Sequence, residues 1–249
     1  MLEIKNLHKS FDGLKAVNDF SLSLQKGKIT SLIGPNGAGK TTVFNIISGY
    51  LDHDIGNIFY NNVSLSNLSP WRRSRLGISR TFQNIRLFKK LTALENVLLA
   101  RQDQSGEKFL NALLTFSIKS PEHQKHIEKV TSLLEFVGLV DKRDDFAENL
   151  SYGQQKLLSI ACCLAAEPAL LLLDEPVAGV QPAMIEKIIS IMKHLVVKDN
   201  KTIFLIEHNI EVVMEISDTI VVMDEGKKIA EDKPSVIHNN TEILEAYLS

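Results

Sequence analysis

Short apolar segments separated by turn residues run along most of the chain, and their spacing predicts its secondary structure. Strands are expected over residues 2–11, 16–24, 29–33, 56–60, 170–173, 202–206, 219–223 and 228–230. Helical periodicity begins at Lys40 and recurs over residues 92–101, 122–137, 153–166, 182–197, 209–216 and 241–248. Leu170–Leu173 is apolar at every position, as is typical of a central parallel strand buried on both faces. The pattern therefore predicts an α/β fold.

The order of these elements divides the chain into parts. Antiparallel strands and one strand–loop–helix unit come first, a helical region follows, and strands then alternate with helices. Gln102–Ser120 is polar at its start and shows no clear strand. We expect a single domain of residues 1–249, with a core of residues 1–81 and 150–249 and an inserted helical subdomain of residues 82–149.

Composition narrows the class of protein. The 249 residues suffice for one large α/β domain, and the 44% hydrophobic and 23% charged content is ordinary for a globular protein. A net charge of −2 argues against a general nucleic-acid binder. No apolar run reaches the ~18 residues that span a bilayer, and the N-terminus lacks signal-peptide features. The adjacent Cys162 and Cys163 are interpreted as buried thiols in a reduced cytosol.

A glycine-rich loop carries the first chemical signal. Gly34–Thr42 fits the pattern G-x-x-x-x-G-K-[ST] and lies between a predicted strand and a predicted helix. Its backbone N–H groups and the helix N-terminus suit phosphates, Lys40 should reach the β- and γ-phosphates, and Thr41 should offer its hydroxyl to Mg²⁺. This context disfavours a fortuitous turn. The predicted nucleotide ligands here are Gly34, Pro35, Asn36, Gly37, Ala38, Gly39, Lys40, Thr41 and Thr42.

Polar residues after two apolar strands complete a hydrolytic site. Asp174 ends the strand that precedes Glu175, so it is placed to hold Mg²⁺, and Glu175 is placed to act as general base towards water. His208 follows another strand and is placed to contact a γ-phosphate, although a lone histidine is usually structural. Gln83 follows a predicted strand too and could reach Mg²⁺ or the water. Without the loop, an Asp-Glu pair would more often be a surface turn.

A second anion-binding turn distinguishes this chain from simple kinases. Leu150–Gln155 is a Ser/Gly-rich turn that opens a helix, with Ser151, Tyr152, Gly153 and Gln154 as candidate ligands. One nucleotide needs only one phosphate loop, so a second turn predicts a nucleotide shared between two copies of the protein. Phe11 ends the first strand, and stacking on adenine and ordinary core packing are equally good interpretations of it.

In this order, the elements resemble the ATP-binding subunits of ABC transporters over essentially the whole chain. The resemblance matches Phe11 to the adenine-stacking aromatic, Gly34–Thr42 to Walker A, Gln83 to the Q-loop, residues 150–154 to the signature, residues 170–175 to Walker B and His208 to the switch histidine.

The resemblance implies a P-loop NTPase core with an antiparallel β subdomain and an inserted α-helical subdomain. It also implies a head-to-tail dimer, with a copy or another ABC ATPase, that holds each ATP between Walker A of one subunit and the signature of the other. Glu175 would be the base, Lys40, His208 and Ser151 of the second subunit would stabilise the γ-phosphate charge, and Thr41, Asp174 and Gln83 would serve Mg²⁺. Closure of the dimer would drive membrane permease subunits, docked through the helical region and Q-loop on the cytoplasmic face of the inner or plasma membrane.

Further segments resemble one branch, the ATP-binding proteins of branched-chain amino-acid importers. They are Arg80–Phe88, Leu94–Val97, Leu150–Gln155, Asp174–Val180, Ile206–His208 and Ala246–Ser249. This implies import of Leu, Ile and Val, with a solute-binding protein as an indirect partner and no nucleic acid. Alternatives are urea or amide importers and lipopolysaccharide export. A soluble ABC ATPase acting on nucleic acid or ribosomes commonly has two such domains or long coiled-coil inserts, which this chain lacks. A P-loop kinase leaves the signature unexplained.

Two residues depart from the usual pattern. Tyr152 stands where most of the superfamily has glycine, so we expect either a negative φ or an outward side chain there. Gln181 stands where the D-loop usually has Asp, or Asn in this branch. Its longer, uncharged amide leads to the hypothesis that coupling between the two ATP sites differs.

A basic cluster is the last candidate feature. It surrounds Trp71 and consists of Arg72, Arg73, Arg75, Arg80 and Arg86. The preferred interpretation is a solvated or ion-paired face, and the alternative is contact with the permease or an anionic membrane.

Overall fold

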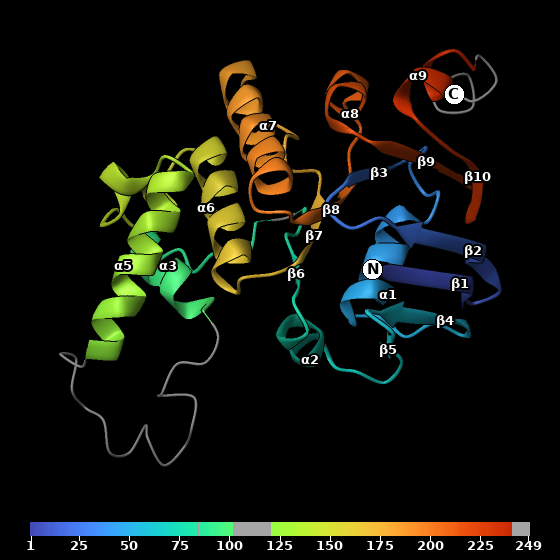
Figure 1. Cartoon of the computed structure of the whole chain (residues 1–249), viewed down its shortest axis with the longest axis horizontal. Helices are drawn as coiled ribbons and strands as arrows, with labels where there is room; N and C mark the ends of the chain where they lie inside the picture. The colour runs from blue at the N-terminus through green and yellow to red at the C-terminus, as the bar shows by residue number, and fades with distance from the viewer. Residues whose placement is uncertain (84, 102–120, 241–249) are drawn as a thin grey trace.

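The computed structural model describes residues 1–83, 85–101 and 121–240, and its centre is a six-stranded sheet (Figure 1). The strand order is β10-β9-β3-β8-β7-β6, with all neighbours parallel except β9 and β10. The strands are β3 (Ile29–Ile33), β6 (Ile78–Arg80), β7 (Leu170–Asp174), β8 (Thr202–Ile206), β9 (Thr219–Asp224) and β10 (Lys227–Asp232).

Strands β7 and β8 are buried at every residue, because both faces of this sheet are covered. Leu172 and Phe204 belong to one core cluster, whereas Leu171 and Leu205 belong to another on the opposite face. The first face packs on α1 (Lys40–Ser48), and Phe44 of that helix lies 4.9 Å from the Phe204 ring, centroid to centroid. The second face packs on α6 (Tyr152–Ala165) and α7 (Pro182–Val197). The remaining helices beside this sheet are α8 (Ile210–Ile216) and α9 (Pro234–His238).

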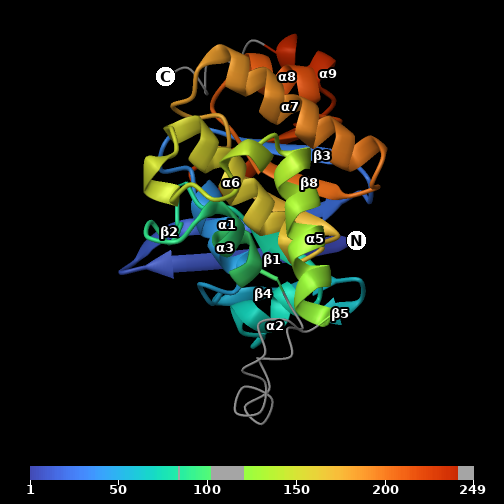
Figure 2. The same ribbon diagram turned by 90° about the vertical axis from the view of Figure 1, so that its left-hand side faces the viewer.

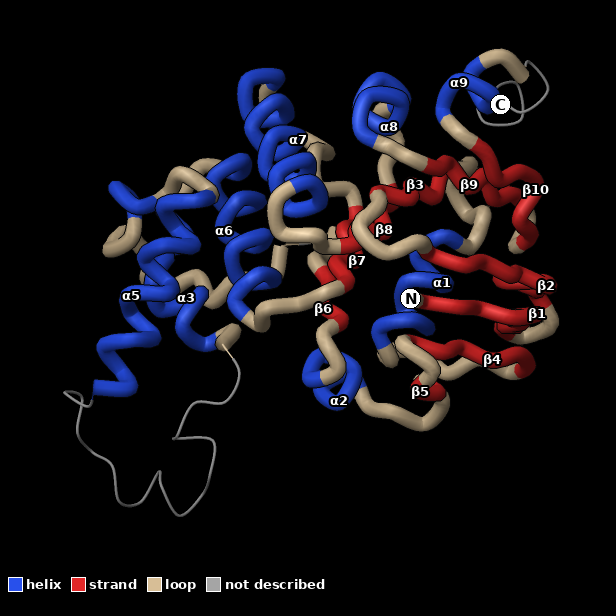
Figure 3. Tube along the Cα trace, viewed as in Figure 1, coloured by secondary structure: helices blue, strands red, loops and turns tan. Residues whose placement is uncertain are grey.

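A second, antiparallel sheet covers the far side of α1. Its order is β2-β1-β4-β5, formed by Leu14–Leu24, Leu2–Phe11, Ile55–Tyr60 and Val63–Ser64. Figure 3 shows α1 between these strands and the parallel sheet. Helix α1 is therefore enclosed on two sides, which explains why Val43, Phe44, Ile46 and Ile47 are fully buried.

The helices of the middle region form one group with α6 (Figure 2). They are α3 (Ala93–Leu99) and α5 (Pro121–Phe136), followed by short 3₁₀ turns at Val140–Lys142 and Ala147–Asn149. A short helix not expected from the sequence, α2 (Pro70–Arg75), precedes β6. No helix in the described ranges has the length and apolar character needed to cross a bilayer. The expectations for residues 102–120 and for a last helix at 241–248 lie outside the described residues.

The predicted solvated or ion-paired face around Trp71 is wrong for Arg73. The side chain of Arg73 is buried and donates to the carbonyls of Ile46 and Ile47 in the last turn of helix α1. Burial lowers the pKa of Arg73. These bonds satisfy carbonyls that a helix end leaves without intrahelical partners. Arg80 is also buried, in an ion pair described below, whereas the guanidinium carbons of Arg72 and Arg75 lie 5.6 Å from the exposed Trp71 ring.

The two cysteines are free thiols, and burial raises the pKa of each to about 12. Because the thiolate is the reactive form, we expect native protein at pH 8 to react with a disulfide reagent such as DTNB about a thousandfold more slowly than free cysteine. Time-resolved absorbance of the released chromophore measures this rate. Denatured protein serves as the control and should release two equivalents per chain. Rapid labelling of native protein would contradict the buried environment.

Candidate functional site

The glycine-rich loop adopts a conformation that other residues would strain. Gly34 and Gly39 have φ values of 152° and 98°. A Cβ at Gly34 would overlap the carbonyl oxygen of Met223, and a Cβ at Gly39 would overlap that of Ala16. The loop can therefore close against the neighbouring backbone only with glycine at these positions. It leads into α1 at Lys40, so the helix N-terminus faces the loop.

The loop borders a cavity of about 240 Å³ that unites residues from distant parts of the sequence. Glu175 follows β7, His208 follows β8, and Gln83 follows β6. These three strands are parallel neighbours, so their carboxyl ends meet at one edge of the sheet. The lining residues are Ala16, Asn36, Gly37, Gly39, Lys40, Thr41, Thr42, Gln83, Glu175 and His208.

Lys40 supplies a buried cation to this cavity. Its Nζ donates to the carbonyl oxygens of Gly34 and Pro35, each at 2.8 Å. Burial lowers the pKa of Lys40, and the negative charges of Glu175 and Asp174 partly oppose that effect. An ammonium with three donors, held at the loop by neutral carbonyls, is suited to transfer its hydrogen bonds to phosphate oxygens.

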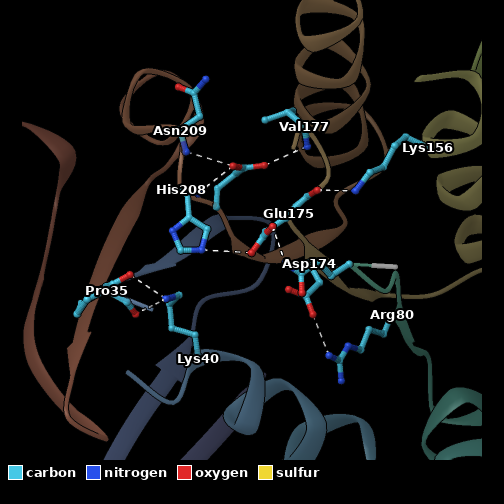
Figure 4. A network of polar contacts seen from close by, with 12 residues as sticks. Pro35, Lys40, Arg80, Lys156, Asp174, Glu175, Val177, His208 and Asn209 are labelled. Atoms are coloured by element: carbon cyan, nitrogen blue, oxygen red, sulfur yellow. Dashed lines mark hydrogen bonds and ion pairs between the residues drawn. The ribbon is translucent and has the colours of Figure 1, made fainter. Parts of the chain in front are cut away.

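Glu175 is held by contacts to both its side chain and its backbone (Figure 4). Its Oε1 lies 3.2 Å from Nε2 of His208, and its Oε2 accepts a hydrogen bond from Nε2 of Gln83 at 2.9 Å. Its backbone N–H donates to the Ile206 carbonyl, and its own carbonyl accepts from Nζ of Lys156. The carboxylate therefore points into the cavity between the two side chains predicted to assist it.

Asp174 is engaged by a partner that sequence reasoning did not assign. Its Oδ2 lies 2.9 Å from Nη2 of Arg80, with the two side chains 2% and 5% exposed. Arg80 also donates to Oδ1 of Asn45 and to Oγ of Ser48, and the backbone N–H of Asp174 donates to Thr81. Burial nevertheless raises the pKa of the Asp174 carboxyl. Arg80 thus offsets the charge of the carboxylate at the end of β7.

Glu207 is a second missed residue, with its side chain buried beside the cavity. Its Oε1 accepts from the backbone N–H of Val177 at 3.0 Å. Its Oε2 accepts from the N–H groups of His208 and Asn209, at 2.9 and 3.2 Å. One carboxylate therefore joins the segment after Glu175 to the loop that carries His208 (Figure 4). The available sequence signal was a charged residue directly after four consecutive apolar residues, Ile203 to Ile206.

The donors near the cavity fit Mg²⁺ bound together with phosphates. Thr41 and Gln83 line the cavity, and one oxygen of Asp174 is engaged by Arg80. In the described part of the chain, no group of three or more His, Cys, Asp or Glu side chains would hold a metal alone. Mg²⁺ commonly takes only one or two protein oxygens and completes its shell with substrate phosphates and water. The oxygen donors present suit that mode.

The signature turn lies outside the cavity lining of its own chain. Ser151 is the N-cap of α6, where its Oγ accepts from the N–H of Gln154 and the Gln154 side chain accepts from the Ser151 N–H. Tyr152 is in the first helical turn, so its backbone has the negative φ expected for a tolerated tyrosine. Ser151 and Tyr152 are exposed. An exposed helix N-terminus that is already capped is a suitable anion site for a second subunit.

Two other predicted residues lie at the surface. Phe11 is 44% exposed and outside the cavity lining, and Nζ of Lys9 lies 5.5 Å from its ring centroid. Gln181 is the exposed N-cap of α7, and its side chain makes no cap hydrogen bond. Adenine stacking by Phe11 and cross-subunit coupling by Gln181 stay predictions.

Comparison with known proteins identifies the family. A model described as "ABC transporter" matches residues 17–178. The chain is 39% identical over 248 residues to the high-affinity branched-chain amino acid transport ATP-binding protein LivG of Salmonella typhimurium, covering 100% of this chain and 97% of LivG. A crystal structure of a nucleotide-free ATP-binding cassette from an ABC transporter superposes with a TM-score of 0.87 at 32% identity, covering 100% of this chain and 99% of that one. A dimeric cassette in a post-hydrolysis state, bound to ADP and Pi, superposes with a TM-score of 0.79 at 26% identity, covering 94% and 99%.

These matches confirm the predicted α/β cassette fold with its antiparallel β subdomain. The family model spans more than half of the chain, and the similarity to LivG extends over its full length. The chain therefore belongs to the ABC transporter family, as one of its ATP-hydrolysing cassettes.

Proposed function

We propose that this cassette powers the uptake of branched-chain amino acids through a membrane permease. The observation that carries the ATPase part is the cavity in which the glycine-rich loop meets Glu175, His208 and Gln83. The full-length similarity to LivG supports the solute class. The cassette works at the cytoplasmic face of the membrane, as a dimer with a copy of itself or a related cassette, and a dimeric relative with ADP and Pi supports that assembly.

The residues at the cavity suit hydrolysis of the γ-phosphate. Glu175 accepts a proton from the attacking water, while His208 and Gln83 hold its two carboxylate oxygens in place. Lys40, His208 and Ser151 of a second subunit stabilise negative charge on the phosphate.

Three residues at or near the cavity are suited to bind Mg²⁺. Thr41, Gln83 and Asp174 would hold Mg²⁺, and the ion would neutralise charge on the phosphate oxygens. Arg80 occupies one oxygen of Asp174 and leaves the other for the metal or its water.

A groove beside the Q-loop supports permease docking at a defined place. It has a volume of about 270 Å³ and lies where α2, β6 and α6 meet. Phe82, Arg86 and Arg80, the partner of Asp174, line this groove, and the guanidinium carbon of Arg86 lies 4.0 Å from the Phe82 ring centroid. A permease helix seated there would contact the segment that leads directly to Gln83. If the basic cluster around Trp71 also contacts an anionic membrane, Arg72 and Arg75 would make that contact.

Transport in a reconstituted system tests the solute class. The cassette would be assembled in liposomes with permease subunits and a solute-binding protein that co-purify with it. We expect uptake of labelled leucine, isoleucine and valine that requires ATP, and no uptake of urea or acetamide. Stimulation only by urea or short amides would identify the alternative importer class instead. Co-purification with ribosomes rather than permease subunits would contradict a transport function.

A further inference from the structure

Lys156 on α6 places a buried cation next to the proposed base. It is 3% exposed and lies on α6 among the buried Leu157, Leu158 and Ile160. Burial lowers the pKa of Lys156, and the charges of Glu207, Glu175 and Asp174 oppose that effect in this order. A buried ammonium is costly unless specific groups compensate it. Its position therefore calls for an explanation beyond packing.

The Lys156 ammonium contacts the backbone of Glu175, the proposed base. Nζ of Lys156 donates to the carbonyl oxygen of Glu175 at 2.8 Å (Figure 4). Glu175 has a φ of 48°, in the left-handed region that costs a non-glycine residue about 1–2 kcal/mol. The N–H of Glu175 donates to the Ile206 carbonyl at 2.9 Å, and the Glu175 carbonyl oxygen also accepts from the N–H of Ala178 at 3.3 Å. Among the hydrogen bonds described for the backbone of this strained residue, the one from Lys156 is the only one with a charged donor.

The same helix carries the signature. Ser151 is the N-cap of α6, and Lys156 follows five residues later, between one and two helical turns along the same helix. Tyr152 adds a second link, because its Cε1 lies 3.1 Å from where a Cβ of Gly179 would be, so the ring packs on the segment after Glu175. The first turn of α6 and the backbone around Glu175 are therefore one connected unit within the subunit.

We propose that Lys156 is a positioning residue that holds the Glu175 backbone in its left-handed conformation and thereby links the base to the signature helix. This inference rests on the proposed ATPase dimer. In that dimer Ser151 contacts the nucleotide of the second subunit, whereas Lys156 acts on the base of its own subunit. A shift of α6 when the second site fills is transmitted through Lys156 to Glu175, so occupancy of one site changes hydrolysis at the other.

Three variants test the inference on the purified full-length chain. Lys156→Met removes the ammonium and keeps the length of the stem, Lys156→Arg keeps the charge with different geometry, and Lys198→Met changes an exposed lysine as the control. ATP hydrolysis against ATP concentration yields kcat, KM and the Hill coefficient. Misplacement of a catalytic group by about 1 Å can cost about 100-fold in rate. We expect kcat of Lys156→Met to fall about 10- to 100-fold, with KM within about twofold and the Hill coefficient reduced towards one.

The remaining outcomes separate positioning from a structural role. Lys156→Arg should recover part of kcat, and Lys198→Met should match the wild type. A Lys156→Met protein with wild-type kcat and Hill coefficient would overturn the inference. So would a Lys156→Met protein that fails to fold together with a Lys156→Arg protein of wild-type kinetics, because Lys156 would then serve stability alone. A wild-type chain that binds ATP but shows neither hydrolysis nor ATP-dependent dimerisation would instead contradict the proposed function.

Discussion

Replacement of Glu175 by glutamine should lower kcat for ATP hydrolysis by about 1,000-fold and leave ATP affinity nearly unchanged, because the change removes only the proton acceptor. Glutamine has the same shape as glutamate, but its amide cannot take a proton from water. The carboxylate lies between His208 and Gln83 at 3.2 and 2.9 Å, so the amide retains a place to hydrogen-bond. Phosphate release measures kcat, and equilibrium binding of a fluorescent ATP analogue measures affinity.

The same variant tests the shared nucleotide site. If hydrolysis normally separates the two subunits, Glu175→Gln should accumulate as a dimer with ATP, which size-exclusion chromatography with light scattering would detect. Glu186→Gln provides a matched control, because Glu186 is exposed on α7 and has no place in the cavity. Turnover of Glu175→Gln at the rate of the control would show that another group is the base.

Replacement of Arg80 by methionine should lower the free energy of unfolding by about 3 kcal/mol, since removal of one partner leaves the other charge buried without compensation. The pair is almost inaccessible, with 5% and 2% of the two side chains exposed. Methionine also loses the hydrogen bonds to Asn45 and Ser48. Equilibrium urea unfolding, followed by circular dichroism, measures the change.

Two further variants define the origin of that loss. Arg72→Met removes a neighbouring arginine that stacks on the exposed Trp71 ring, and it should change stability by no more than about 0.5 kcal/mol. Combining Arg80→Met with Asp174→Asn should recover part of the stability, because the uncompensated carboxylate is gone. Equal stability of Arg80→Met and Arg72→Met would refute a structural role for the ion pair.

Local patterns in the sequence were sufficient to predict most of the elements. The apolar strands β7 and β8 and the glycine-rich loop appear at their predicted positions, because each depends on a few consecutive residues. Order along the chain also identified the family, which the comparisons confirm. Short elements such as α2 and β6 were less predictable, since six and three residues carry little periodicity. The roles of the site residues stay predictions.

The sequence by itself determined which chemical groups the site contains, whereas only the tertiary structure decided which of them touch. Arg80 looked like part of a surface cluster, yet it pairs with Asp174, 94 residues away, because β6 lies beside β7 in the sheet. Lys156 looked like an ordinary helix residue, yet α6 packs so that its ammonium reaches the Glu175 carbonyl. A local pattern reports which face of an element is apolar, but strand order and helix packing determine where each buried charge finds its partner.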